Sequence, residues 1–385
     1  MSFIPYSRQD ISDDDIDAVC RVLRSDFLTQ GPQVPAFEQA FAELHQVTHA
    51  VAVSNATAGL HIGCLALGVG PGSRVWTSPN SFLASANCAL YCGAKVDFVD
   101  IDPATRNMSV QALCEKLERT AASDKPDVVI PVDFSGLPCD LREIRELADL
   151  HGFKILEDAS HATGAKYLDQ PVGSAFAHAS VFSFHAVKIV TTGEGGLVTT
   201  QDAELARRLR LLRSHGMTRD AQAMERAPDG PWYYEQCMLG YNDRMTDLQA
   251  ALGSSQLARL HTMHAGREAL ADRYDALFAK LPLLLPARLS DRRSAWHLYV
   301  VEIDDNRMTT TRAEAFEHMR RAGIGVNVHY IPIHTQPHYA RLGFKRGDFP
   351  ASERYYARAM SLPLFPALTG EQQDFVARTL AAVLG

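Results

Sequence analysis

The stretch Ser183-Phe-His-Ala-Val-Lys188, followed by Ile-Val-Thr-Thr-Gly-Glu-Gly-Gly196, places one lysine between an apolar run and a glycine-rich turn. The apolar run predicts a buried strand, and the glycines allow the backbone to turn tightly. A lysine amine has an ordinary pKa of about 10.4 and is a weak nucleophile at neutral pH. Where its charge is disfavoured, it can form a Schiff base with an aldehyde. The stretch therefore indicates a reactive Lys188, although a surface lysine beside a glycine turn would have the same local sequence.

Short apolar runs alternate with helical patterns on both sides of this stretch. The chain opens with a helix over residues 13–25, which Ser12 and Asp15 start as a capping box. Strands are then predicted at 49–53, 74–77, 95–100, 127–132, 153–157, 180–182 and 196–200, and helices at 56–67, 82–92, 110–121, 141–151 and 203–213. This order predicts an α/β fold with a mostly parallel sheet covered by helices on both faces.

The pattern changes after residue 213. Residues 217–242 are rich in Gly, Pro and aromatic residues and predict a long ordered loop, which is usually functional in a compact enzyme. A long helix at 246–265 follows, and then come a strand at 297–303, a helix at 312–322 and a strand at 326–329. We therefore expect a large domain over residues 1–265, including the N-terminal segment, and a smaller C-terminal α/β domain over 266–385, since 385 residues is long for one domain.

The composition is that of an ordinary globular protein, with 46% hydrophobic and 22% charged residues. A formal net charge of -7 and no dense stripe of Lys and Arg argue against a nucleic-acid partner. We find no secretory signal and no apolar stretch long enough to span a membrane. The seven cysteines are scattered, with no Cys or His pair at zinc spacing, so we expect free thiols, no metal site and a cytoplasmic location.

Ligands of open α/β sheets bind at the carboxyl ends of the strands, so polar residues there are the candidate site. The first such end is Ser54-Asn-Ala-Thr57, where a strand passes into a helix. A helix N-terminus offers free backbone N–H groups and a positive dipole end to a phosphate, and the Thr57 hydroxyl adds a hydrogen bond. A plain N-cap by Ser54 or Asn55 would explain the same residues.

A second strand ends in Glu157 and Asp158, and His161 follows three residues later. Neighbouring strand residues face opposite sides, so the two carboxylates cannot share one role. A buried Asp158 needs a partner, and a protonated pyridinium nitrogen is suitable because it keeps a cofactor ring electron-withdrawing. His161 could hydrogen-bond the substituents of that ring. A helix cap by Asp158 and a structural His161 remain the alternative.

A third strand end carries Ser183 with Lys188, and a fourth carries Asn80, Ser81 and Phe82, whose ring could stack on a planar ligand or lie in the core. Together, these features indicate a pyridoxal 5'-phosphate site: a phosphate cradle, a buried aspartate, a lysine able to form a Schiff base and a glycine-rich turn.

The motifs of this chain resemble those of the DegT/StrS sugar aminotransferases from Tyr6 to Leu364. They are Leu-Thr-Gln-Gly-Pro at 28–32, Ser-Asn-Ala-Thr-Ala-Gly-Leu at 54–60, Glu-Asp-Ala-Ser-His-Ala-Thr-Gly at 157–164, Phe-Ser-Phe-His-Ala-Val-Lys at 182–188, Thr-Thr-Gly-Glu-Gly-Gly at 191–196, Arg-Ser-His-Gly at 213–216 and Gly-Tyr-Asn-Asp-Arg-Met at 240–245. The resemblance implies the type I fold of aspartate aminotransferase. It also implies transfer of an amino group from L-glutamate to a nucleotide-linked keto sugar, leaving 2-oxoglutarate.

By this resemblance, Lys188 is the lysine that holds pyridoxal phosphate, and Lys188 and Asp158 are the catalytic residues of a ping-pong reaction. The residues implied in cofactor binding are Ala56, Thr57, Phe82, Asp158, His161, Ser183, Lys188 and Asn242. Asn242 matches an asparagine that reaches the phosphate of the neighbouring subunit in the family. A homodimer with shared active sites is therefore implied. Some relatives carry His at the lysine position and deoxygenate sugars, so the lysine of this chain favours transamination.

Within the family, four motifs most resemble the enzymes of the pseudaminic acid pathway that aminate C4 of a UDP-linked 4-keto-6-deoxy-N-acetylhexosamine. They are the Tyr6-Ser start, Leu-Thr-Gln-Gly at 28–31, Ser-Phe-His-Ala-Val-Lys at 183–188 and Val-His-Tyr-Ile-Pro at 328–332. The resemblance then implies a substrate cleft lined by Tyr6, Asp26, Phe27, Leu28, Thr29, Val328, His329, Tyr330 and Ile331. Asp26 and Phe27 are not distinctive matches. The alternatives are an aminotransferase for another nucleotide-linked keto sugar and a binding or regulatory protein that keeps the fold without turnover.

Overall fold

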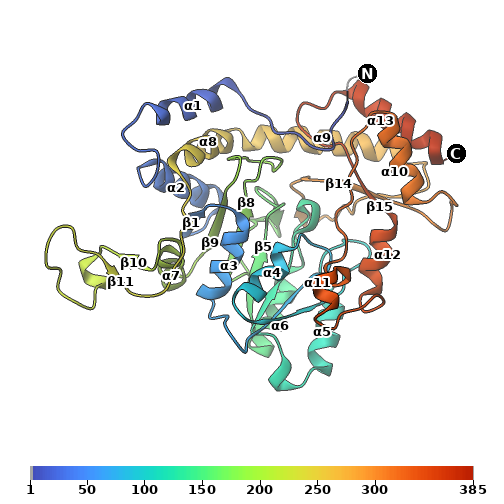
Figure 1. Ribbon diagram of the computed structural model, residues 1–385. Coiled ribbons are helices and arrows are strands. Elements are labelled where there is room, and N and C mark those ends of the chain that lie inside the picture. The colour runs from blue at the N-terminus through green and yellow to red at the C-terminus, as the bar shows by residue number, and fades with distance from the viewer. Residues whose placement is uncertain (1–2, 385) are drawn as a thin grey trace.

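A seven-stranded sheet forms the centre of the larger part of the molecule in the computed structural model, which describes residues 3–384 (Figure 1). Its strands are β1 (His49–Val53), β2 (Arg74–Thr77), β3 (Lys95–Phe98), β4 (Val128–Ile130), β5 (Lys154–Asp158), β8 (Ala179–Ser183) and β9 (Gly196–Thr200). They lie in the order β1-β9-β8-β5-β4-β2-β3. The strands from β8 to β3 are mutually parallel, and β9 is antiparallel to both β1 and β8. The predicted α/β fold with a mostly parallel sheet is confirmed.

Helices cover both faces of this sheet. The α-helices of the described chain, including those of the C-terminal part, are α1 (Asp13–Leu23), α2 (Gln33–His45), α3 (Ala56–Ala66), α4 (Ala84–Tyr91), α5 (Val110–Arg119), α6 (Leu141–His151), α7 (Ala203–Arg213), α8 (Asp247–Ala258), α9 (Leu260–Phe278), α10 (Arg312–Arg321), α11 (Pro337–Ala340), α12 (Pro350–Arg358) and α13 (Gly370–Leu384). Helices α3, α4 and α7 pack on one face, and α2 and α6 contact the other. Within residues 3–384, no helix is both long and apolar enough to cross a membrane.

Helix α3 lies unusually close to the sheet because two of its positions are glycine. A Cβ at Gly59 would lie 2.9 Å from Val181 of β8, and a Cβ at Gly63 would lie 3.1 Å from Leu156 of β5. Any larger residue at Gly59 would push the helix outward. This close packing fixes the N-terminus of α3 beside the carboxyl ends of β5 and β8.

The C-terminal part is built on a smaller antiparallel sheet of β12 (Leu283–Leu284), β14 (Tyr299–Ile303) and β15 (Ala359–Leu362). Helices α9, α10 and α13 supply its core, and Ile4 from the N-terminus packs into the same core. The predicted domain boundary at 265/266 falls inside α9, whose first turns pack with the core of the large sheet and whose last turns pack in the C-terminal core. The division into two domains stays a prediction.

Three expectations about the elements differ from the structure. The sequence analysis did not predict α2, whose apolar residues Val34, Phe37 and Phe41 are buried against the sheet. The helix predicted at 246–265 is two helices that meet at Arg259, and the second continues to Phe278. The prediction of a strand at 326–329 is wrong, because Asn327 makes only an isolated bridge to Ser361.

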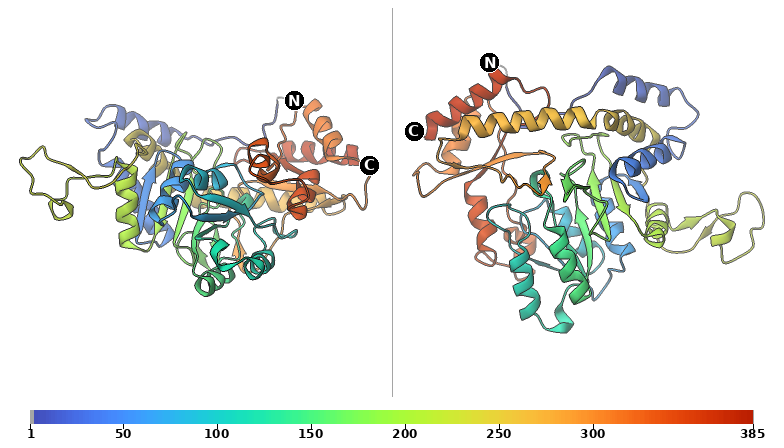
Figure 2. Two further views of the ribbon diagram at one scale, coloured as in Figure 1. Left: turned by 60° about the horizontal axis from the view of Figure 1, so that its bottom comes forward. Right: turned by 180° about the vertical axis from the view of Figure 1, so that it is seen from behind.

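The predicted loop at 217–242 contains a short two-stranded ladder of β10 (Met217–Thr218) and β11 (Glu235–Gln236). Figures 1 and 2 show that this segment extends away from the body of the molecule as an arm. Its side chains include two large exposed residues, Trp232 and Tyr234. An arm with exposed aromatic residues is suited to contact another surface.

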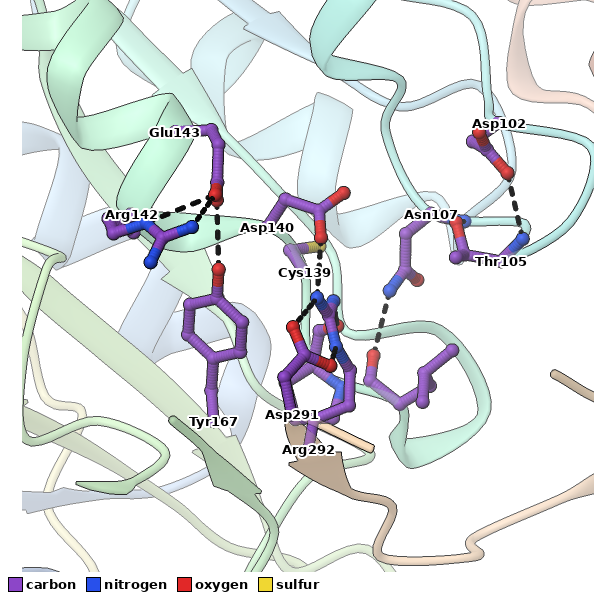
Figure 3. A network of polar contacts seen from close by, with 12 residues as sticks. Asp102, Thr105, Asn107, Cys139, Asp140, Arg142, Glu143, Tyr167, Asp291 and Arg292 are labelled. Atoms are coloured by element: carbon purple, nitrogen blue, oxygen red, sulfur yellow. Dashed lines mark hydrogen bonds and ion pairs between the residues drawn. The ribbon is translucent and has the colours of Figure 1, made fainter. Parts of the chain in front are cut away.

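A polar network ties the segment before β14 to the large sheet (Figure 3). Strand β13 (Arg292–Arg293) pairs with β6 (Lys166–Tyr167), which also pairs with β7 (Gln170–Pro171). The nearly buried Arg292 guanidinium bonds Asp140 at 2.6 Å and Asp291 at 2.7 Å, and it covers the ring of Tyr167. These contacts fix the chain a few residues before it enters the candidate site.

Candidate active site

A cavity of about 790 Å³ lies where β5 and β8 end, between the large sheet and the C-terminal part. Its far wall comes from the segment 327–330. The lining residues are Tyr6, Asn55, Ala56, Thr57, Leu60, Ser81, Phe82, Ala84, Val132, Asp158, Ser160, His161, Ser183, His185, Val187, Lys188, Glu194, His297, Asn327, Val328, His329 and Tyr330. The volume is that of a site for a small organic ligand.

Lys188 lies in this cavity at the end of a turn that the glycine-rich stretch closes. Backbone hydrogen bonds join Phe184 to Gly195 and Thr192 to Phe184, each at 2.9 Å. Gly193 has a φ of +79°, a backbone conformation that favours glycine. Desolvation by the surrounding protein lowers the pKa of Lys188 to about 8, and the nearby Asp158 opposes part of that shift. About a tenth of its amine is therefore uncharged and nucleophilic at pH 7, far more than for an ordinary lysine.

Asp158 ends β5 and is almost completely buried. Its Oδ2 accepts a hydrogen bond of 2.6 Å from the hydroxyl of Ser85, and its Oδ1 accepts one of 3.1 Å from the backbone N–H of Ser160. Ser81 lies 2.6 Å from Ser85, and since the Ser85 hydrogen goes to Asp158, Ser81 donates to Ser85. The adjacent Glu157 bonds Ser180. The two carboxylates thus have separate environments, as strand alternation requires.

Helix α3 points its N-terminus into the cavity. Asn55 caps the helix, and its side chain accepts from the backbone N–H of Ala58 at 2.9 Å. The N–H groups of Ala56 and Thr57 belong to the first turn and have no partner within the helix. Gly196 lies against this turn, where a Cβ would be 2.6 Å from the Ala56 nitrogen. The arrangement is a cradle for an anion.

These donors and acceptors fit pyridoxal phosphate. A helix N-terminus with hydroxyls of Thr57 and Ser183 suits a phosphate, a buried carboxylate suits a protonated ring nitrogen, and a lysine of lowered pKa suits an aldehyde. All of these groups line one cavity. Among residues 3–384, no group of three or more His, Cys, Asp or Glu side chains is arranged to hold a metal ion.

Most of the residues predicted from the sequence meet in this cavity. They are Tyr6, Ala56, Thr57, Phe82, Asp158, His161, Ser183, Lys188, Val328, His329 and Tyr330. Phe82 is 59% exposed and lies at the mouth of the cavity, so it is not a core residue. Their specific roles stay predictions.

The other predicted residues lie outside the cavity, although all are within the described part of the chain. Asp26 and Phe27 line a separate cavity of about 700 Å³ between α1 and α8. Thr29 pairs with Thr246, and the carbonyl of Leu28 accepts the N–H of Asp247. Ile331 is exposed, and the exposed Asn242 pairs with Ser214. Contacts of these residues with a ligand in this cavity would need a second subunit or a different conformation.

In and directly behind the cavity wall lie residues that the sequence analysis missed. Ser85 holds Asp158, and its spacing of four residues from Ser81 at a helix start is the signal that could have identified it. His297 packs on His161 with ring centroids 4.4 Å apart, and no local motif marks it. His185 and Glu194 lie 4.0 Å apart at the exposed side of the lysine turn.

Comparison with known proteins agrees with this geometry. A sequence profile of the DegT/DnrJ/EryC1/StrS aminotransferase family matches residues 9–381. The spore coat polysaccharide biosynthesis protein SpsC of Bacillus subtilis is 42% identical over 377 residues, which cover 97% of this chain and 95% of SpsC.

Solved structures of sugar aminotransferases superpose on nearly the whole chain. Helicobacter pylori PseC, an aminotransferase involved in the biosynthesis of pseudoaminic acid, has a TM-score of 0.90 at 31% identity and covers 100% of this chain and 99% of its own. The PLP-form of the putative sugar aminotransferase Spr1654 of Streptococcus pneumoniae has a TM-score of 0.89 at 30% identity, with 99% and 98% covered. The expected fold of the pyridoxal-phosphate-dependent aminotransferases is confirmed. The chain belongs to the DegT/DnrJ/EryC1/StrS aminotransferase family and is a sugar aminotransferase that uses pyridoxal phosphate.

Proposed function

We propose that this enzyme moves the amino group of L-glutamate to C4 of a UDP-linked 4-keto-6-deoxy-N-acetylhexosamine, in the pathway to pseudaminic acid. The main support for this chemistry is that Lys188, Asp158 and the N-terminus of α3 line the same cavity. The choice of sugar rests on the likeness to Helicobacter pylori PseC over the full chain. It also rests on the motifs of residues 182–188 and 328–332.

In this proposal, the cradle of Ala56, Thr57 and Ser183 binds the cofactor phosphate, and Asp158 pairs with the ring nitrogen. The hydrogen bond from Ser85 holds the Asp158 carboxylate in one orientation. Phe82, which lines the cavity and is exposed, would lie against the ring. Pyridoxal phosphate supplies an electron-withdrawing ring that stabilises negative charge at the reacting carbon.

Lys188 is the residue that moves the proton. With a pKa of about 8, its Nζ is partly uncharged at neutral pH and can take the proton from Cα of glutamate. In the second half-reaction, the same Nζ gives a proton to C4 of the sugar. The order would be ping-pong, because glutamate leaves as 2-oxoglutarate before the keto sugar enters, and the amino group would stay with the bound cofactor in between.

The sugar would bind against the wall opposite the strand ends. Tyr6, Val328, His329 and Tyr330 line that wall, and Ile331 follows them at the surface. This wall contains aromatic rings and backbone amides, which suit a sugar ring and its substituents.

We further propose a homodimer in the cytoplasm, with each active site completed by the second subunit. Asn242 bridges to Ser214 at the end of segment 217–242, where it is exposed and can reach another chain. Residues 26–29 are likewise exposed. A second subunit would bring such residues to a cavity that they do not line in their own chain.

A second candidate is the amination of a different nucleotide-linked keto sugar. SpsC, which is named for spore coat polysaccharide biosynthesis, is 42% identical to this chain, whereas PseC is 31% identical. Fold and cofactor site are shared across such enzymes and do not fix the substrate. A binding protein without turnover is disfavoured, because Lys188, Asp158 and Ser183 are all present in the cavity.

The test is to offer the purified enzyme a panel of UDP-, dTDP- and GDP-linked keto sugars with L-glutamate, and to identify by mass spectrometry and NMR which product gains an amine. Amination at C4 of the UDP-linked N-acetylhexosamine with release of 2-oxoglutarate is the expected result. Faster amination of another sugar would favour the second candidate. Absence of any amination by a cofactor-loaded enzyme would contradict the function itself.

A further inference from the structure

Two acidic side chains lie behind the cavity, on the face of the sheet opposite to Asp158. Glu157 precedes Asp158 in β5, and neighbouring strand residues point to opposite faces. Val132 bridges to Asp158 and lines the cavity with it, and the next residue, Asp133, hydrogen-bonds the Glu157 carboxyl. Both acidic side chains are completely buried. The reaction described above gives neither of them a role.

Each of these carboxyls uses one oxygen to accept a hydrogen bond. Asp133 Oδ1 accepts from the backbone N–H of Cys139 at 2.8 Å, and Glu157 Oε2 accepts from the hydroxyl of Ser180. The other two oxygens, Asp133 Oδ2 and Glu157 Oε1, are buried and receive no N–H or O–H donor from residues 3–384. They are therefore the oxygens through which the two carboxyls meet.

A hydrogen bond between two carboxyls requires a proton, because ionised carboxylates only accept and two like charges repel in a buried site. Desolvation raises the pKa of Glu157 well above its ordinary value, and the charge of Asp133 raises it further. Desolvation also raises the pKa of Asp133, but only to about 6, because the Cys139 N–H stabilises its charge. The proton therefore resides on Glu157, and the charge resides on Asp133.

Two other titratable groups face the pair, and they are Asp158 and Cys139. Burial raises the pKa of the Cys139 thiol, which therefore stays neutral. Asp158 is joined to the pair by its backbone, since the Asp133 N–H donates to the Asp158 carbonyl at 3.1 Å and the Asp158 N–H donates to the Pro131 carbonyl at 2.9 Å. A buried negative charge this close to Asp158 favours the protonated form of any base that Asp158 contacts.

We propose that Asp133 and Glu157 share one proton, and that the single negative charge of this pair helps to keep the cofactor ring nitrogen protonated. Both are positioning residues, because they act through Asp158 and are not among the residues that line the cavity. The shared proton is independent of the cofactor. The effect on the ring rests on the proposed function, in which Asp158 pairs with the ring nitrogen.

Infrared spectroscopy of the purified protein at pH 8 tests the shared proton through the carbonyl band of a protonated carboxyl. The wild-type protein should show this band. Glu157→Gln should lose it, because the acid is gone, and Asp133→Asn should lose it, because the new amide N–H favours an ionised Glu157. Glu302→Gln is the matched control and should keep the band, since Glu302 is buried between Arg106 and Arg358 and is therefore ionised.

A double-mutant cycle tests the same proton by stability. Each single amide variant keeps one donor facing one acceptor. In the double variant, the Cys139 N–H and the Ser180 hydroxyl hold both amide oxygens, so two N–H groups face each other. Urea unfolding should show that the double variant unfolds at least about tenfold more readily than the product of the single effects. Independent effects of the two substitutions would overturn the shared proton.

Nitrogen NMR of the protein loaded with labelled pyridoxal phosphate tests the effect on the ring. Glu157→Gln and Asp133→Asn each keep one charge, so the pH at which the ring nitrogen loses its proton should be unchanged. Asp133→Ala removes the charge, because Glu157 then stays protonated. That pH should fall by about one unit. The double amide variant is also neutral and should give the same fall.

Two results overturn the proposal. One is an infrared band that keeps its full intensity in Glu157→Gln, and the other is a ring titration that is the same in wild type and in both neutral variants. Asp158→Asn tests the proposed function separately. It should lower the titration of the ring nitrogen by more than Asp133→Ala does, and no change in this variant would contradict the pairing of Asp158 with the ring while the infrared result still stands.

Discussion

Ser85 donates a hydrogen bond of 2.6 Å to Oδ2 of Asp158, and this bond joins the start of α4 to the end of β5. A buried carboxylate that loses a donor also loses its fixed orientation. We expect Ser85→Ala to lower kcat about tenfold, because the Asp158 carboxylate that would pair with the ring nitrogen loses one hydrogen bond. Steady-state kinetics at saturating glutamate measure the change.

Ser109→Ala is the control for Ser85. Ser109 caps α5 far from the cavity, and its loss should cost about 1 kcal/mol of stability without changing kcat. Equal kcat values for wild type and Ser85→Ala would show that Asp158 does not depend on this serine.

The titration of Lys188 predicts how cofactor attachment depends on pH. The pKa in the folded protein is lowered to about 8, so the amine loses its proton as the pH rises through 8. The rate at which the cofactor-free protein attaches pyridoxal phosphate should therefore rise with pH and reach half its maximum near 8, well below the ordinary lysine value of about 10.4. Stopped-flow absorbance measures this rate. A midpoint above 10 would contradict the assignment, and Lys188→Ala should show neither the absorbance change nor turnover.

Gly196 predicts a defect in cofactor binding. In Gly196→Ala, the new Cβ would lie 2.6 Å from the Ala56 nitrogen, so the N-terminus of α3 must shift. We expect the dissociation constant of pyridoxal phosphate to rise at least about tenfold, since the phosphate loses aligned N–H groups. The control is Gly266→Ala in the interior of α9, where a Cβ meets nothing within 4 Å. It should stabilise the protein by about 0.5–1 kcal/mol with unchanged binding.

The Arg292 network predicts a difference between two arginines of Figure 3. The Arg292 side chain is 4% exposed and bonds Asp140 and Asp291, whereas Arg142 is 53% exposed. Arg292→Met should lower the free energy of unfolding by about 2 kcal/mol, because Asp140 and Asp291 lose their common partner. Arg142→Met should change it by less than about 0.5 kcal/mol. Urea unfolding followed by circular dichroism distinguishes the two.

Subunit mixing tests the proposed shared active site. Lys188→Ala and Asn242→Ala should each be nearly inactive alone. After unfolding and refolding together, half of the dimers contain one subunit of each kind, and each of these has one complete site. Activity should return to about a quarter of the wild-type value. No recovery, despite heterodimers detected by differential tagging, would show that Asn242 serves its own subunit or none.

The elements around the site were predictable because their signals are local. Strands β1 and β2 have the predicted bounds, since each is a short apolar run between turn residues. Helix α2 was missed because it follows the turn-forming segment 28–32, and Pro32 lies directly before its first residue. The segment 326–329 has the composition of a strand but makes only one isolated bridge, and tertiary contacts decide its conformation.

Site residues were predictable where a motif marks them, as for Lys188 and Asp158. No motif identifies Ser85 or His297. The fold places Ser85 against Asp158 and His297 against His161. The positions of residues 26–29 and Asn242 relative to an active site depend on a second chain. No pattern within one sequence fixes that arrangement.

The two walls of the cavity come from different hydrophobic cores, and this has a consequence for how such enzymes diversify. Lys188, Asp158 and the N-terminus of α3 are anchored in the large sheet, whereas residues 327–330 pack with the C-terminal sheet. Tyr330 links the two walls, because it bonds Asn80 and His161. Exchange of residues 326–329 between relatives, with Tyr330 kept, is thus a rational starting point for engineering new amino sugars.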